Sequence, residues 1–137
     1  MKGAFYIFSF SLLFLAGCGT LALSEGENIQ TYNSSFNDVF DATIQYLQDA
    51  GYGINTQTKS DAAPYVATVR TEEREYDNER SQVRILIQGI ETGVTRVSIS
   101  LDIEARTEQG GWIEVIMTGQ ESDMRFSAIL GGIGALL

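Results

Sequence analysis

The segment from Val94 to Ala105 is the most regular pattern in the sequence, because apolar and polar residues alternate along it. Successive side chains of a β-strand point to opposite faces, so this pattern predicts a strand with one buried face and one solvated face. Burial on one side only is typical of antiparallel sheets, since parallel sheets are normally covered on both sides. The residues predicted to face inward are Val97, Ile99, Leu101, Ile103 and Ala105.

Shorter segments with the same period of two indicate further strands of this sheet. Glycine-containing turns at 91–93 and 108–111 separate the regular segment from its neighbours, as expected of hairpins. These segments together predict an antiparallel sheet of four to six strands. The further strands are expected at 29–33, 54–59, 65–69, 83–87 and 113–117, the last with Ile113, Val115 and Met117 facing inward.

The clearest helix is expected between Phe36 and Leu47, where apolar residues recur with a period of 3.6 and form one stripe. Ser34 or Ser35 can cap its N-terminus, and Gly51 is placed to end it as the glycine that follows a helix C-terminus. An aromatic stripe of this kind is typical of core packing. We therefore expect this helix to lie on the sheet.

A closing helix is expected from Ser122 to Leu137, with Ser122 as its cap. With the first helix it completes an α+β domain in which both helices pack on one face of the sheet. Its last ten residues, 128–137, are apolar and rich in glycine, and they are too few to span a bilayer. Three interpretations of this tail stay open: close packing on the sheet, self-association or partner binding, and contact with the membrane.

The N-terminus has the order of a secretory signal peptide: a positive residue, Lys2, then an uncharged apolar run, then small residues. The run ends at Leu15-Ala16-Gly17-Cys18, which holds the only cysteine of the chain. This ending resembles the lipobox of bacterial lipoproteins. The resemblance implies cleavage before Cys18, a diacylglycerol on its sulfur, and an acyl chain such as palmitate on its amine.

This interpretation divides the chain into a signal peptide at 1–17, a lipidated cysteine with its tether at 18–28, and a single domain at 29–137. Gly19 follows the cysteine, where an aspartate in the lipoprotein family favours the inner membrane, so the resemblance implies anchoring to the outer membrane, facing the periplasm. The alternatives are an ordinary cleaved signal, which would leave Cys18 as an unpaired thiol, and a membrane-spanning helix. A spanning helix requires roughly 20 apolar residues, and Gly17, Gly19 and Glu25 interrupt this run.

Composition excludes several classes of function. The chain carries 9 basic and 18 acidic residues, a net charge of −9, and removal of residues 1–17 with Lys2 makes it −10. Nucleic-acid binding requires clustered Lys and Arg, so we expect no nucleic-acid partner. The chain has no histidine, which removes the commonest general base and the commonest zinc ligand. We therefore expect no catalytic residues, no metal site and no cofactor.

Three other features of the sequence are candidate sites. The charged run from Glu72 to Arg80 lacks the glycine and oxygen spacing of a calcium loop, so a solvated hairpin is the favoured interpretation. Asp102 and Glu104 share the polar face of their strand, where Arg84 and Arg96 are expected to pair with acids across strands. Trp112, beside a glycine turn, is a candidate contact residue, with coverage of the sheet edge by its ring as the alternative.

The order strand, helix, antiparallel strands, helix behind a lipobox resembles small uncharacterised bacterial lipoproteins. Their domain is similar to those of BamC, the outer-membrane accessory lipoprotein of barrel assembly. The residues that carry the resemblance are Phe36 to Leu47, Ala50-Gly51-Tyr52 and Val94 to Ala105. It implies an accessory role at the outer membrane.

We therefore expect a non-catalytic, lipid-anchored envelope protein that interacts with another envelope protein. The alternative is a small-molecule or lipid binder with a pocket between the sheet and Phe36, Phe40 and Ile44 of the first helix.

Replacing the cysteine tests the anchor. We expect Cys18→Ser to move the protein from the membrane fraction to the soluble fraction, because a serine cannot carry the thioether-linked lipid that holds it. Fractionation followed by immunoblotting measures the distribution. Continued membrane association of the variant would contradict lipidation at this residue.

Overall fold

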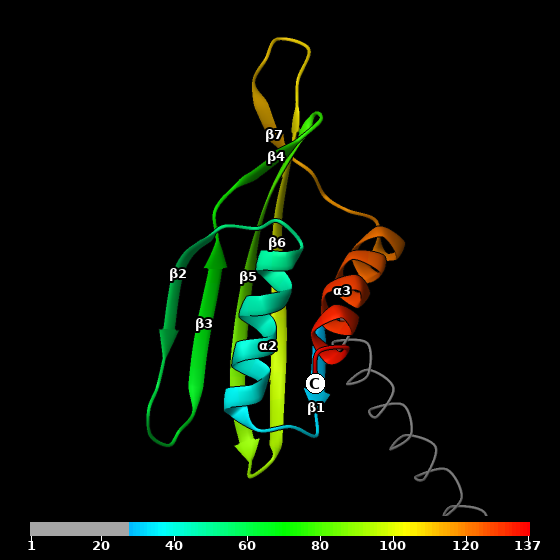
Figure 1. Cartoon of the computed structure of the whole chain (residues 1–137). Coiled ribbons are helices and arrows are strands. Elements are labelled where there is room, and N and C mark those ends of the chain that lie inside the picture. The colour runs from blue at the N-terminus through cyan, green and yellow to red at the C-terminus, as the bar shows by residue number, and fades with distance from the viewer. Residues whose placement is uncertain (1–27) are drawn as a thin grey trace, which may run out of the picture.

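The computed structural model describes residues 28–137 of the protein (Figure 1). Its elements run in the order β1, α2, β2, β3, β4, β5, β6, β7, α3. The predicted signal peptide, the lipobox with Cys18 and the tether up to residue 27 lie outside the described residues and stay predictions.

All strand pairings are antiparallel, as predicted from the alternating segments. The sheet has seven strands in the order β1-β6-β5-β3-β2, with β4 paired to β5 and β7 paired to β6. The strands are β1 (Ile29–Tyr32), β2 (Ile54–Lys59), β3 (Val66–Thr71), β4 (Arg74–Tyr76), β5 (Glu79–Glu91), β6 (Val94–Arg106) and β7 (Trp112–Glu114).

The long hairpin of β5 and β6 forms the centre of the sheet, with 13 residues in each strand. Gly93 lies in its turn with φ of +74°, a conformation that glycine adopts without steric cost. The predicted inward row of β6 is confirmed at Val97, Ile99 and Ile103, which are buried. From the neighbouring strand β5, Val83, Ile85 and Ile87 add a second buried row.

Helix α2 (Phe36–Asp49) begins and ends where the sequence predicts. The Ser35 hydroxyl caps it by accepting a hydrogen bond of 3.2 Å from the Asp38 N–H. Gly51 follows the helix with φ of +87°. The helix contacts β2, β3, β5 and β6, and its stripe contributes Val39, Phe40 and other apolar residues to the core.

Helix α3 (Gly119–Gly134) lies on the same face of the sheet as α2 and contacts α2 and β1 (Figure 1). The prediction that it begins with Ser122 as its cap is wrong. Thr118 is the cap, in a reciprocal capping box with Glu121, which satisfies two of the N–H groups at the helix start. On the side of α3 that faces the core, Ile129, Leu130 and Ile133 are buried. The Tyr32 hydroxyl donates a hydrogen bond of 2.5 Å to the Leu130 carbonyl.

The glycines of α3 permit close packing. A Cβ at Gly132 would lie 2.1 Å from Cε2 of Tyr46 on α2, and one at Gly134 would lie 3.2 Å from Cε1 of Tyr32 on β1. Of the three interpretations of the tail, the structure supports close packing, with α2 and β1 as the contacted elements. No helix within residues 28–137 has the length and apolarity needed to cross a membrane.

Two predictions about the end of the sheet need correction. The sheet has seven strands and not four to six, because the three-residue β4, which was not predicted, adds one strand to the six expected segments. Ile113, predicted to face inward, is 58% exposed, and the last strand ends at Glu114. The reason is visible in Figure 1: β7 pairs with the end of β6 that projects beyond both helices, so neither helix covers it.

Alanine substitutions at two adjacent glycines test the packing of α3. We expect Gly132→Ala to destabilise the fold by about 1–3 kcal/mol, because the new methyl group overlaps the Tyr46 ring and forces it to move. Gly131→Ala is the matched control, since no atom lies within 4 Å of its Cβ. There the higher helix propensity of alanine should stabilise by up to about 1 kcal/mol. Urea denaturation measures both, and equal stability of the two variants would contradict the packing.

Candidate functional site

The face of the sheet opposite the helices is open to solvent. Side chains directly paired across neighbouring strands share a face, so the register defines this surface. We call it the outer face. Its side chains include those of Thr56, Thr58, Thr68, Arg70, Arg80, Gln82, Arg84, Leu86, Gln88, Arg96, Ser98, Ser100, Asp102 and Glu104.

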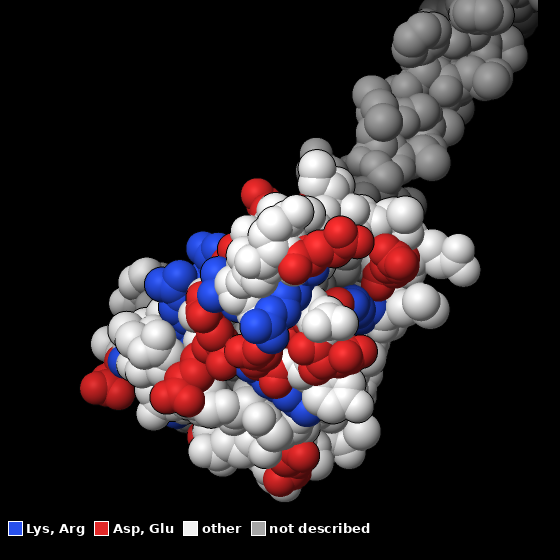
Figure 2. Space-filling model, turned by 90° about the horizontal axis from the view of Figure 1, so that it is seen from above, with Lys and Arg blue, Asp and Glu red and all other residues white. Residues whose placement is uncertain are grey.

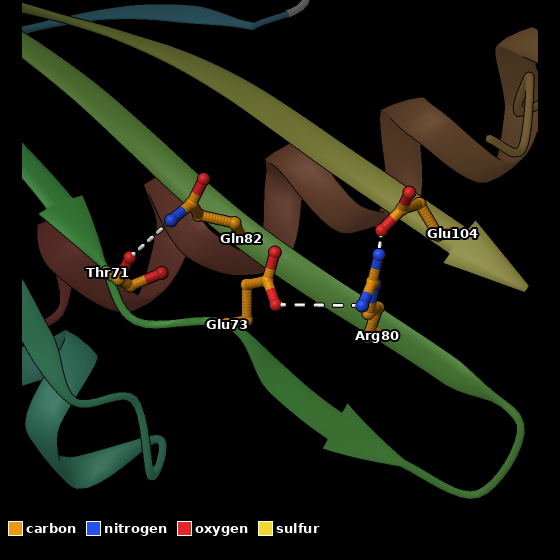
Figure 3. A network of polar contacts seen from close by, with 5 residues as sticks. All are labelled: Thr71, Glu73, Arg80, Gln82 and Glu104. Atoms are coloured by element: carbon orange, nitrogen blue, oxygen red, sulfur yellow. Dashed lines mark hydrogen bonds and ion pairs between the residues drawn. The ribbon is translucent and has the colours of Figure 1, made fainter. Parts of the chain in front are cut away.

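One end of the outer face holds a network of charges around Arg80 (Figure 3). The Arg80 Nε donates to the carboxylate of Glu104, and its Nη1 lies 3.9 Å from Oε2 of Glu73. This hydrogen bond from Arg80 is the main cause that lowers the pKa of the Glu104 carboxyl. The Arg80 guanidinium also lies over the Trp112 ring, with its Cζ 4.8 Å from the ring centroid.

A break in strand register brings Glu73 to this network. Arg70 of β3 pairs with Arg84, whereas Arg74 of β4 pairs with Ser81, so β3 and β4 together contain one residue more than the facing part of β5. At this bulge the Thr71 carbonyl accepts a hydrogen bond of 2.9 Å from the Gln82 side-chain amide (Figure 3).

Asp102 and Glu104 lie on the same face of β6, and each pairs with a different arginine. Arg84 forms the predicted cross-strand ion pair, with Asp102. Glu104 pairs with Arg80 and not with Arg96, because Arg80 lies directly opposite it in the register. Each carboxylate is thus held by an arginine, an arrangement that favours ordinary ion pairs over shared proton chemistry.

Trp112 lies in β7 and is partly buried, with the Arg80 guanidinium on its ring. A contact between this residue and another molecule stays a prediction. The run from Glu72 to Arg80 forms the β4–β5 hairpin, as favoured from the sequence, with Asp77 at φ of +57° in its turn.

Seen from the end of the molecule that carries β4 and β7, acidic and basic side chains lie intermixed on the surface (Figure 2). Within residues 28–137 no group of three or more Asp, Glu, His or Cys side chains is placed to hold a metal ion.

A shallow hollow of about 480 Å³ lies on the outer face between β2, β3, β5 and β6. It contains two arginines and no carboxylate. Its polar lining consists of Asn28, Thr56, Thr68, Arg70, Arg84, Ser98 and Ser100.

The sequence did not single out Arg70. The alternation of Thr68, Val69 and Arg70 does predict that the Arg70 side chain points outward. That it faces Arg84 follows only from the pairing of β3 with β5, which alternation along one strand does not specify.

A second hollow, of about 590 Å³, lies near the start of α2, at the end of the sheet away from the Arg80 network. Phe36, Pro64, Tyr65 and Ile90 give it a partly apolar lining. Of the residues predicted to line a pocket, only Phe36 borders this hollow. Phe40 is 8% exposed within the core.

These features define an α+β protein in which an antiparallel sheet carries two helices on one face and leaves the other face open. Residues 5–103 match a family described as a protein of unknown function, DUF3568, and the chain belongs to that family. The match extends from the N-terminal segment into β6 and ends before β7 and α3. No curated protein matches the sequence significantly.

Proposed function

We propose that the protein is a non-catalytic accessory module of the bacterial cell envelope, anchored by lipid at Cys18, whose outer face binds another protein. The observation that carries this proposal is the one-sided construction of the domain. Both helices pack on one face of the sheet, while Thr68, Arg70 and Ser100 on the other face are exposed.

The composition of the outer face supports binding over catalysis. The carboxylates of Asp102 and Glu104 are each paired with an arginine. The sequence contains no histidine, and its only cysteine is the proposed site of acylation. A broad surface of hydroxyl and guanidinium groups is suited to polar contacts with a protein, since arginine is enriched in protein interfaces.

The N-terminal sequence supports the location. Lipidation at Cys18 with Gly19 behind it favours the outer membrane by resemblance to lipoproteins, and BamC-like domains serve as accessory parts there. A tether of residues 18–28 has a reach of at most about 40 Å when extended. The domain would therefore act close to the membrane surface.

The hollow beside Phe36 supports a second candidate, the binding of a small apolar molecule or lipid. Its volume of about 590 Å³ falls within the range of ligand pockets, and Tyr65 and Ile90 offer apolar contact area. It lies at the end of the sheet, so the two candidates use different surfaces and can be tested separately.

Site-specific photocrosslinking in intact cells tests the proposal. A benzophenone amino acid at Ser100, on the outer face, should give a covalent adduct with an envelope protein, because the partner lies over this position. The same amino acid at Gln45, on the exposed side of α2, is the matched control and should give none. Immunoblotting and mass spectrometry of the purified adducts measure the result.

Adducts from Gln45 but not from Ser100 would contradict the proposal. A third position, Ile90, reports on the second candidate. A small-molecule or lipid adduct there, without a protein adduct at Ser100, would favour ligand binding as the function.

A further inference from the structure

We propose that the hollow on the outer face binds a carboxylate from an acidic segment of the partner protein, with Arg70 as the principal donor. This inference rests on the proposed function, because it names the chemistry of the partner that the same surface would recognise. It is carried by two arginines that lie opposite each other in the sheet and by the charge around them.

Arg70 and Arg84 lie directly opposite each other on β3 and β5. Like charges at directly opposed positions of an antiparallel pair destabilise the sheet, because their Cβ atoms are only about 5 Å apart. A sheet that is selected for stability alone would place a neutral or acidic side chain at one of the two positions. The pairing therefore calls for an anion that neutralises it.

Only one of the two arginines has such an anion within the described residues. Arg84 forms its ion pair with Asp102, which lies diagonally across β6, two residues beyond the direct partner Ser100. Arg70 is exposed and has no carboxylate within 4.0 Å in the part of the chain from 28 to 137. A carboxylate from another molecule would pair with Arg70 as Asp102 pairs with Arg84.

The surroundings of Arg70 suit a carboxylate. Thr56 lies opposite it on β2, and Thr68, Ser98 and Ser100 line the same hollow, so the hollow offers hydroxyl groups as well as the guanidinium. Guanidinium and carboxylate groups form two parallel hydrogen bonds with good geometry, a fit that a lysine does not offer.

The charge of the hollow contrasts with the rest of the molecule. Its lining holds two cations and no anion, although acidic residues outnumber basic ones by 18 to 9 in the chain. The hollow around Arg80, by comparison, is lined by four acidic residues. An acidic segment would be repelled by most of this surface and attracted here, which fixes the position and orientation of the partner. Because the proposed function gives this face a protein partner, we assign a protein carboxylate and not a lipid phosphate.

Binding of a defined probe tests the inference. The full-length protein in detergent micelles is titrated into a fluorescent peptide of alternating Glu and Ser, with fluorescence anisotropy as the readout. We expect Arg70→Gln to weaken binding about tenfold, since it removes a charge-assisted hydrogen bond. Arg70→Lys should recover only part of the loss. Arg106→Gln, which removes the same charge from the far end of β6, is the matched control and should bind as the native chain does.

The stability of the variant separates a binding defect from a folding defect. Because Arg70 faces a like charge, Arg70→Gln should melt at the same temperature as the native chain or higher. Equal losses of binding in Arg70→Gln and Arg106→Gln, or equal affinity for a peptide with Gln in place of Glu, would overturn the proposal. So would binding of inorganic phosphate that depends on Arg70 and is tighter than binding of the Glu peptide.

Crosslinking in cells distinguishes failure of this inference from failure of the proposed function. If the Ser100 adduct forms in undiminished yield in the Arg70→Gln background, the outer face binds a protein but not through Arg70. If the native chain gives no Ser100 adduct, the proposed function itself fails. The inference is supported when the adduct forms, depends on Arg70, and maps to a partner peptide that contains Asp or Glu.

Discussion

The hairpin of β5 and β6 must bury one face of two long strands, and the other elements are arranged around that requirement. Val83, Ile85 and Ile87 on one strand and Val97 and Ile99 on the other form a continuous apolar surface. Exposure of such a surface would cost roughly 25 cal/mol for each Å². Helices α2 and α3 remove it from water together, which requires them to contact each other closely at Gly132 and Tyr46. Because both helices serve this one face, the other face remains available for binding.

Patterns that depend on one segment alone could be predicted from the sequence. The boundaries of α2 follow from the Ser35 cap and from Gly51, and β6 follows from its alternation. The start of α3 was predicted four residues too late, because Ser122 lies nearer the apolar stretch than Thr118, which forms the capping box with Glu121. Ile113 was wrongly predicted to be buried for a different reason. Alternation along a strand predicts which side chains share a face, but the lengths and positions of the helices determine which of these side chains are covered.

The contacts of the candidate site depend mostly on the register between strands, which the sequence of one strand does not determine. Arg84 was correctly expected to pair with an acid, since a charged row on one face of a sheet favours such pairs. The pairing of Arg80 with Glu104, and the opposition of Arg70 and Arg84, arise from how β3, β5 and β6 align and from the bulge before β4. A one-residue shift of these strands would place different side chains together. The site residues predicted from the sequence, Cys18 and Trp112, concern the proposed anchor and the end of the sheet.

The central claim is that the outer face is free in the isolated protein and covered in the cell. The most direct test compares the rate at which a maleimide modifies Thr68→Cys in the purified protein and in intact cells with a permeabilised outer membrane, read at the level of the peptide. Gln45→Cys on the exposed side of α2 is the control for access of the reagent. We expect Thr68→Cys to react readily in the purified protein and several times more slowly in cells, while Gln45→Cys reacts alike in both. Equal reactivity of Thr68→Cys in the two settings would mean that nothing covers the outer face in the cell.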